Sequence, residues 1–318
     1  MQRCSLSSKE GYPTKKHSVS HQIKRGWQLY LLLVLPLLYL LLFRYAPMYG
    51  AQIAFKNYSI TKGIWDSPWI GFNHFVRFFN SYDFWRIMKN TLLLSLYHLV
   101  ATFPFPVLFA LGLHYIANVR FRKTLQLVTY APHFISVVVM VGLILQFLSP
   151  RIGPMAVLTE RLGLHMPNVM GDASWFKSVY VWSDVWQHTG FSCIIFIAAL
   201  AGIDPALHEA ALMDGASKVR RIWHIDVPGI MPIAIILLIL NVGRIFDLGF
   251  EKVLLMQNPL NTRSSEIIDT YVYNVGLKSM VPNFSYASAI GLFKNVIAFI
   301  LVMSVNQLSK KFGQSSLW

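Results

Sequence analysis

Six long apolar runs, separated by polar segments, set the pattern of this 318-residue chain. Each run reaches the roughly 20 residues that a helix needs to cross a hydrocarbon layer about 30 Å thick. Because lipid offers no hydrogen bonds to backbone groups, runs of this length must be helical. The pattern therefore predicts an all-α, polytopic membrane protein with six transmembrane helices. The predicted spans are about 27–49, 91–116, 125–148, 179–200, 230–250 and 287–307.

Prolines lie inside several of these runs. In a soluble helix, each proline would remove a backbone hydrogen bond and break the helix. In a membrane bundle, neighbouring helices and water can satisfy the freed carbonyl groups. We therefore expect kinks rather than helix ends at Pro36, Pro104, Pro106, Pro132 and Pro232.

Basic residues are divided unevenly between the two sides of the predicted membrane. The chain has 28 Lys and Arg against 14 Asp and Glu, a net charge of +14. Six spans place both termini on one side, together with loops 117–124 and 203–229. That side carries 14 Lys and Arg in about 70 residues, whereas the other side carries 11 in about 107. Since cytoplasmic loops are enriched in Lys and Arg, we expect a basic cytoplasmic tail, 1–26, and a second cytoplasmic tail, 308–318.

Little in the sequence suggests catalysis, metal binding or nucleic-acid binding. Cys4 and Cys193 are the only cysteines, and they have no metal-ligand spacing. The chain lacks the G-x-x-x-x-G-K-[ST] loop that holds the phosphates of ATP. We therefore expect a protein that is not itself an enzyme and that holds no metal or cofactor. We also expect the first span to be retained, because the bulky residues 44–49 do not resemble a cleavage site.

The loop 203–229 predicts a short helix that caps itself. Asp204 is a favourable N-cap, and Pro205 suits the first helical position. Residues 206–213 are good helix formers, and Gly215 can adopt the left-handed conformation that ends a helix. A rigid helix between two spans allows a partner that grips it to move both spans.

The same loop resembles a family motif. Residues 209–211 read EAA and 214–216 read DGA, with Ile225 and Pro228 downstream. This spacing resembles the EAA loop of permease subunits in binding-protein-dependent ABC importers, although Asp226-Val227 replaces the family's Thr-Leu-like pair. The resemblance implies the type I ABC importer permease architecture, with the short helix docked on an ATP-hydrolysing subunit. It assigns this ATPase-coupling role to Glu209, Ala210, Ala211, Asp214 and Gly215.

The resemblance extends along nearly the whole chain, to one branch of carbohydrate permeases. It is carried by segments 46–50, 53–56, 131–136, 257–259, 270–273 and 316–318. That branch is associated with oligosaccharides from uronate-containing polysaccharides such as alginate. The resemblance implies a bacterial inner-membrane subunit that forms half of an oligosaccharide pathway. The implied partners are a second permease subunit, favoured as non-identical, two subunits that bind ATP and Mg, an extracytoplasmic binding protein and membrane lipid.

Polar residues inside the predicted spans are candidates for the substrate pathway, because such residues are costly in lipid. On the fifth span, Asn241, Arg244, Asp247 and Glu251 are expected to share one helical face. The alternative is a set of internal ion pairs, Arg244 with Asp247 and Lys294 with Asp184 or Glu251. The full set of pathway candidates is Asp184, Gln187, Asn241, Arg244, Asp247, Lys294 and Asn295.

Two other functional classes compete with the importer permease. In an ion-coupled secondary transporter of a polar solute, Asp247 would be the coupling acid near the middle of the membrane. A membrane-embedded enzyme would need a nucleophile and base pair or a metal set, and the sequence suggests neither. The EAA-type loop is explained only by the importer permease.

Overall fold

A computed structural model describes residues 26–311, and the chain falls into two units, 1–52 and 53–318, each described by itself. Residues 1–25 and 312–318, which hold most of the two predicted tails, lie outside the described residues. Within the described part the regular structure is helical, and β pairing is limited to two isolated bridges, Lys56–Trp69 and Ser59–Gly63.

The first unit contains one long apolar helix. It is built from α2 (Trp27–Leu40), the π-helical turn η1 (Leu41–Tyr45), α3 (Ala46–Met48) and the start of the 3-10 helix η2 (Tyr49–Phe55). Pro36 lies inside α2 without breaking it. None of the side chains described from 27 to 48 is buried. A helix that is apolar all round needs lipid or protein around it, which agrees with a membrane span.

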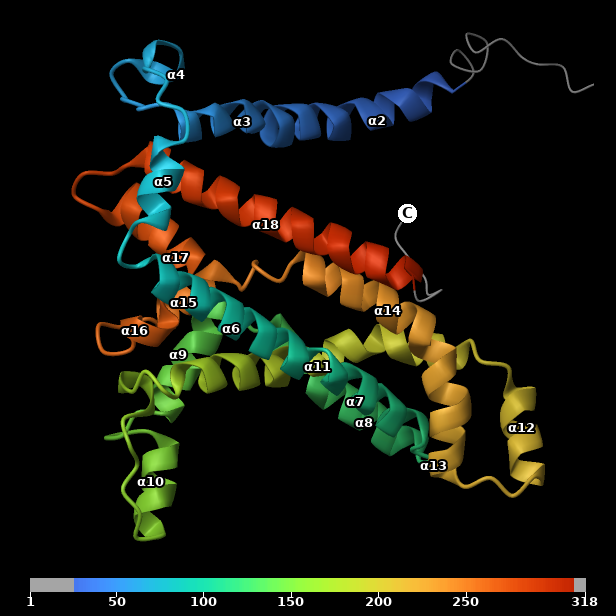
Figure 1. Ribbon diagram of the computed structural model, residues 1–318. Coiled ribbons are helices and arrows are strands. Elements are labelled where there is room, and N and C mark those ends of the chain that lie inside the picture. Colours follow the sequence, from blue (N-terminus) through green and yellow to red (C-terminus); the bar gives the residue numbers. More distant parts are fainter. Residues whose placement is uncertain (1–25, 312–318) are drawn as a thin grey trace, which may run out of the picture. The chain divides into compact units, whose positions relative to one another are not determined.

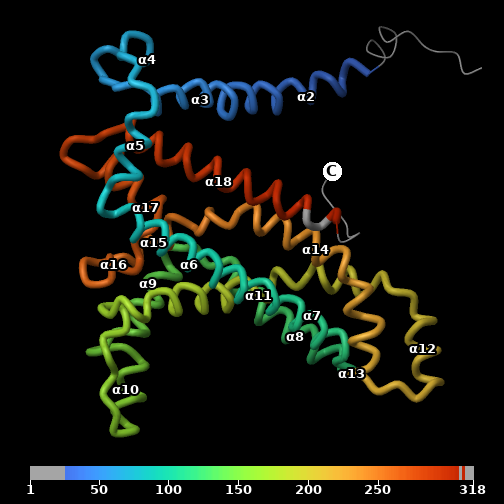
Figure 2. Tube along the Cα trace, in the orientation of Figure 1, coloured from blue at the N-terminus to red at the C-terminus, as the bar shows by residue number. Residues whose placement is uncertain are grey.

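The second unit contains the other long apolar helices, which Figures 1 and 2 show in sequence colours. Counting Trp27–Phe55, the described chain has five helices long and apolar enough to cross a membrane. Four of these lie in the second unit. Two are single helices, α11 (Phe176–Ala201) and α18 (Phe284–Lys311). The other two are composite: α6 (Phe84–Thr102) continues into α7 (Pro104–His114), and α13 (Lys218–Arg221) continues through the π-helical turn η5 (Ile222–Asp226) into α14 (Val227–Gly243).

A broken pair of helices accounts for the sixth apolar segment. The pair consists of α8 (Val119–Tyr130) with η3 (Ala131–Phe134), and α9 (Val137–Phe147), with a bend of 101° between them. Ile135 and Ser136 have extended backbones, and the Ser136 side chain caps α9 by accepting the amide of Val139. The break is sharper than the kink predicted at Pro132, because the helix ends there and a new one begins.

The helix of the fifth predicted span, α14, ends earlier than the sequence predicts. It stops at Gly243, and residues 244–249 form a turn and an irregular stretch in which Gly249 has φ +63°. Glu251 lies on a separate helix, α15 (Phe250–Met256). The prediction that Asn241, Arg244, Asp247 and Glu251 share one helical face is therefore wrong, since only Asn241 is helical with the span.

Short helices fill the connections between the long ones. The first and second long helices are joined by α4 (Gly63–Asp66) and α5 (Asn73–Phe79), and α9 is joined to α11 by α10 (Pro154–Arg161) and η4 (Val169–Gly171). The segment before α18 contains α15, α16 (Thr262–Ser265), α17 (Ile268–Tyr273) and η6 (Asn274–Lys278). The loop between α11 and α13 contains α12 (Pro205–Met213).

Helix α11 is the centre of the second unit and packs against α6, α7, α8 and α14. One apolar cluster, which includes Cys193, Phe196 and Ile230, joins α7, α11 and α14. At Gly190, a Cβ atom would collide with the backbone carbonyl of Thr129 on α8. Only glycine permits this approach, so α8 and α11 lie backbone to backbone. The core therefore fixes the helices whose polar side chains are described next.

Candidate functional site

Helix α12 is a self-contained element of nine residues in the loop between two long helices. The Asp204 side chain accepts the Ala206 amide at 2.9 Å, and Pro205 occupies the first turn. Gly215 has φ +71°, and the Ala216 amide donates to the Ala211 carbonyl at 2.9 Å. These contacts satisfy both ends of the helix. They confirm the predicted helix together with its start and stop.

The outer surface of α12 is unusually apolar for an exposed helix. Leu207 and Leu212 are more than half exposed, and Met213 is 89% exposed. Glu209 and Ala210 are exposed beside them, and Glu209 makes no ion pair with any described residue. A compact patch of exposed apolar side chains around one free carboxylate is suited to binding another protein.

Two contacts hold α12 on the base of the next long helix. A Cβ on Gly229 would meet the side chain of Ile203 at 2.6 Å, so this glycine makes room for the residue just before the helix. His208 Nε2 lies 3.2 Å from Asp226 Oδ1, and Tyr115 donates its hydroxyl to Asp226 Oδ2 at 2.7 Å.

A shallow hollow lies where α12 ends. Its volume is about 280 Å³, and it lies between the end of α12 and the α13–η5 segment. It brings together two of the residues predicted to couple to an ATPase, Ala211 and Asp214, with three basic side chains, Arg220, Arg221 and His224. The exposed patch and this hollow adjoin each other along one helix.

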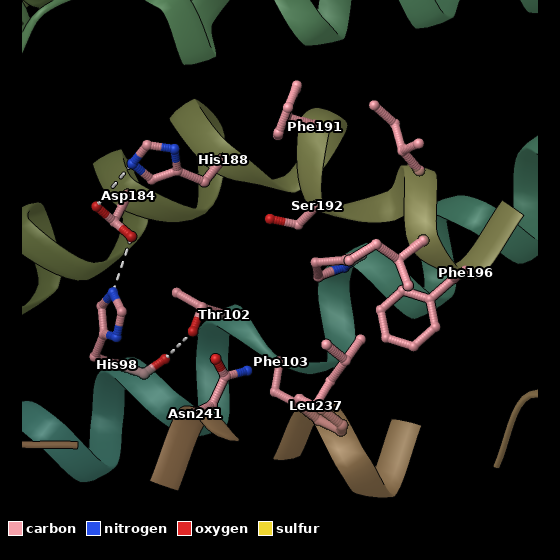
Figure 3. Close-up of a pocket in the computed structure, with 13 residues that line it drawn as sticks. His98, Thr102, Phe103, Asp184, His188, Phe191, Ser192, Phe196, Leu237 and Asn241 are labelled. Atoms are coloured by element: carbon pink, nitrogen blue, oxygen red, sulfur yellow. Dashed lines mark hydrogen bonds and ion pairs between the residues drawn. The ribbon is translucent and has the colours of Figure 1, made fainter. Parts of the chain in front are cut away.

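A polar cavity of about 540 Å³ opens between α6, α7, α11 and α14 (Figure 3). Figure 3 shows Asp184 and His188 on α11 facing His98 and Thr102 on α6, with Asn241 on α14. The remaining wall is apolar and includes Phe191, Phe196 and Leu237. Polar groups on facing helices with an apolar surround are typical of a ligand cavity in a helical bundle.

Asp184 is the electrostatic centre of this cavity. Its Oδ2 lies 2.8 Å from His98 Nε2, and its Oδ1 lies 3.0 Å from Lys252 Nζ and 3.6 Å from His188 Nε2. Lys252 is 4% exposed and also donates to the Tyr180 carbonyl at 3.3 Å. A buried carboxylate needs such partners. The predicted pairing of Asp184 with Lys294 is wrong, because Lys252 takes that place.

Two further cavities adjoin the first through shared lining residues. A cavity of about 110 Å³ shares His98, Thr102 and Asn241 with the first, and it is also lined by Arg244 and Asp247. Asp247 in turn lines a third cavity of about 710 Å³, with Asp269 and Lys294. We call these three adjoining cavities the polar track, after the charged and polar side chains that they share within a mostly apolar lining.

Lys294 is held by two carboxylates on this track. Its Nζ lies 2.7 Å from Asp269 Oδ1 and 3.3 Å from Asp247 Oδ1. Arg244 makes no ion pair within residues 26–311, and its only contact with Asp247 is between backbone atoms. The internal pairs expected for Lys294 with Glu251 and for Arg244 with Asp247 are therefore wrong. Arg244 is an exposed guanidinium on a polar surface.

Five of the seven predicted pathway residues line these cavities, and two do not. The lining residues are Asp184, Asn241, Arg244, Asp247 and Lys294. Gln187 is buried and donates to the Ile135 carbonyl at 2.9 Å, which is the carbonyl freed by the break between η3 and α9. Asn295 is exposed on α18 and lines none of the three cavities.

Sequence reasoning missed three residues, namely His98 and Asp269, which line the cavities, and Lys252, which pairs with Asp184. His98 resembles an ordinary packing histidine in an apolar run, and only its distance from Asp184 shows otherwise. Lys252 and Asp269 lie outside the predicted spans, on α15 and α17, which fold back to the bundle. The sequence held one hint of them. Asp184 and Lys294 are charged residues inside predicted spans, so each needs a partner of opposite charge.

The long apolar helices, the capped helix α12 and the adjoining cavities are the features of this chain that the family comparison explains. Residues 91–314 match the family described as the binding-protein-dependent transport system inner membrane component, and the chain belongs to that family. It is therefore a permease component of a binding-protein-dependent ABC transporter, as the EAA-type loop indicated, and the ion-coupled transporter is not favoured.

Curated relatives match nearly full length. Protein LplB of Bacillus subtilis is 42% identical over 93% of this chain and 92% of its own. The polygalacturonan/rhamnogalacturonan transport system permease protein YteP of the same organism is 41% identical over 91% of this chain and 90% of its own.

Solved structures have the same fold. A chain in the crystal structure of a bacterial ABC transporter involved in the import of the acidic polysaccharide alginate has 37% identity and a TM-score of 0.85, covering 92% of this chain and 98% of that one. A chain of bacterial alginate ABC transporter in complex with an alginate pentasaccharide-bound periplasmic protein has 36% identity and a TM-score of 0.86, covering 94% and 99%.

Proposed function

We propose that this chain forms half of the membrane pathway of an ATP-driven importer of acidic oligosaccharides. The observation that carries this proposal is the exposed and unpaired guanidinium of Arg244, which lines the middle cavity of the polar track. A guanidinium binds a carboxylate through two parallel hydrogen bonds. Support comes from two of the relatives described above, the polygalacturonan/rhamnogalacturonan permease YteP and the transporter involved in the import of the acidic polysaccharide alginate.

Cargo movement is proposed to be driven through α12. The exposed patch of α12 and Glu209 would bind an ATP-hydrolysing subunit, and the contacts of Ile203 and His208 would pass its motion to α14. Two such subunits would bind ATP and Mg, since this sequence has no phosphate loop. Glu209, Ala210, Ala211, Asp214 and Gly215 are the proposed coupling residues.

The half-pathway calls for a second permease subunit on the open side of the track. A non-identical partner is supported by the family resemblance, and an extracytoplasmic binding protein would deliver the cargo. The excess of Lys and Arg in loops 117–124 and 203–229 supports a cytoplasmic position for α12 and for both termini, in a bacterial inner membrane.

The test is reconstitution of the transporter. The tagged chain, expressed with the genes that flank it, should co-purify an ATPase and a second permease subunit. Liposomes containing this complex and its binding protein should take up an oligogalacturonate or oligoalginate faster than a neutral oligosaccharide of equal length. Uptake by liposomes containing this chain alone would contradict the proposal, as would equal uptake of charged and neutral sugars.

A further inference from the structure

Three side chains from distant parts of the sequence meet at the base of α12. They are His114 at the end of α7, His208 on α12 and Asp226 at the end of η5. One ligand atom from each, two imidazole nitrogens and a carboxylate oxygen, lie within 4.8 Å of one another. Figure 1 shows α12 beside the α13–η5–α14 helix, where this group lies. None of the three lines the cavities of the polar track, and the coupling proposed above uses only the contact between His208 and Asp226.

Asp226 is the least ordinary member of the group. The residue has no exposed surface, yet its Oδ1 accepts no hydrogen bond from the part of the chain that the structure describes. His208 Nε2 lies 3.2 Å from this oxygen, but without hydrogen-bond geometry. A buried carboxylate oxygen in this position is strongly disfavoured unless a cation or donor reaches it. The position therefore calls for a positive charge between Asp226 and the histidines.

Two imidazoles and a carboxylate form a ligand set typical of Zn²⁺ and related divalent metals. With metal–ligand distances of about 2.0–2.2 Å, the three donor atoms would have to move together. His114 is exposed and His208 is half-buried, so both can turn inward while the buried carboxylate stays in place. Three protein ligands leave a fourth position for water.

Tyr115 supplies the outer contact that such sites usually have. Its hydroxyl donates to Asp226 Oδ2 at 2.7 Å, so the carboxylate is oriented with Oδ1 towards the histidines. Hydrogen bonds to ligating carboxylates fix the ligand and strengthen metal binding. The guanidinium of Arg221 lies over the Tyr115 ring, 5.7 Å from its centroid.

We propose that His114, His208 and Asp226 bind one divalent transition-metal ion of the Zn²⁺ class, and that the ion ties α12 to η5 and to the end of α7. The sequence alone predicted no metal site, because these residues share no local motif. The ligation depends on this chain alone, so it can be tested without cargo, ATP or a partner subunit.

The experiment measures Zn²⁺ and Co²⁺ binding to the purified full chain in detergent after treatment with a chelator. We expect one Zn²⁺ per chain by calorimetry and a visible absorption band for tetrahedral Co²⁺. His208→Ala and Asp226→Asn should each weaken Zn²⁺ binding at least 10-fold, and Tyr115→Phe should weaken it by about 10-fold. His224→Ala is the matched control, because this exposed histidine on η5 lies outside the group.

Each contrary outcome has a clear meaning. Absence of Zn²⁺ binding at micromolar concentration in the wild type overturns the proposal. Equal affinity in the wild type and in His208→Ala also overturns it, and so does a loss in His224→Ala of the same size. If His208→Ala lowers thermal stability equally with and without Zn²⁺, the contact is an ion pair and not a metal site. Size-exclusion elution of each variant shows that it is folded.

Discussion

The loop 203–229 and the polar track differ in how their structure is encoded. The hydrogen bonds that start and end α12 join near neighbours in the sequence, from the Asp204 cap to the bond between Ala216 and Ala211. The track depends instead on contacts such as His98–Asp184 and Lys294–Asp269, which join separate helices. Local structure follows from short patterns, whereas the track follows only from how the bundle packs.

The largest expected effect tests helix α12, whose ends are set by local contacts. Gly215→Val should abolish cargo-stimulated ATP hydrolysis, with at least a 10-fold loss, because a β-branched residue at φ +71° costs about 1–2 kcal/mol or more. Space is not the obstacle, since a Cβ there meets nothing within 4 Å. The measurement is ATP hydrolysis by the reconstituted complex.

Gly215→Asn is the matched control, because asparagine adopts the left-handed conformation more readily. It should retain most of the stimulation, and both variants should insert into the membrane normally. Glu209→Lys, which reverses the charge of the exposed patch, should weaken retention of the ATPase during purification. If Gly215→Val and Glu209→Lys both keep full stimulation, α12 is not the coupling element.

The second effect tests a long-range contact, the close packing of α8 against α11 at Gly190. Gly190→Ala should destabilise the bundle by about 1–3 kcal/mol, because the new Cβ meets the Thr129 backbone, which cannot move aside. Gly112→Ala is the control, since a Cβ there meets nothing within 4 Å on a helix of the same bundle. Thermal unfolding in detergent compares the two variants. Equal midpoints would show that α8 and α11 are not in close contact.

The third effect concerns the free cation on the track. Arg244→Gln should reduce uptake of an acidic oligosaccharide by about 10-fold, the equivalent of one lost charged hydrogen bond. Uptake of a neutral oligosaccharide should change much less. Lys294→Gln is the contrast, because Lys294 already has Asp247 and Asp269 as partners. Its removal should lower the yield of folded protein and affect both cargoes alike.

The smallest effect separates Gln187 from the pathway. Gln187→Leu leaves the Ile135 carbonyl without its partner at the helix break, which should cost about 1 kcal/mol of stability. The cargo preference should be unchanged, because Gln187 lines none of the three cavities. Uptake of charged and neutral sugars by the same liposomes measures both quantities. A changed preference would return Gln187 to the pathway.

The sequence predicted the long helices and the short helix α12 well, because both rest on composition or on neighbouring residues. Apolar length alone indicated the long helices, and the Asp204, Pro205 and Gly215 pattern gave α12 its ends. The end of the fifth helix at Gly243 could not be predicted, because an apolar run does not show where a membrane helix unwinds. The ion pairs of Asp184 and Lys294 were assigned to wrong partners, since α15 and α17 return to the bundle from outside the spans.

The contact at Gly190 has a mechanical consequence. Because the backbones of α8 and α11 touch there, neither helix can rotate or slide without driving side chains into its neighbour. Helix α11 ends at Ala201, only three residues before the Asp204 cap of α12. A displacement of α12, as proposed above, would therefore move α11 and α8 together as one packed pair. That pair ends at the helix break at Ile135 and Ser136.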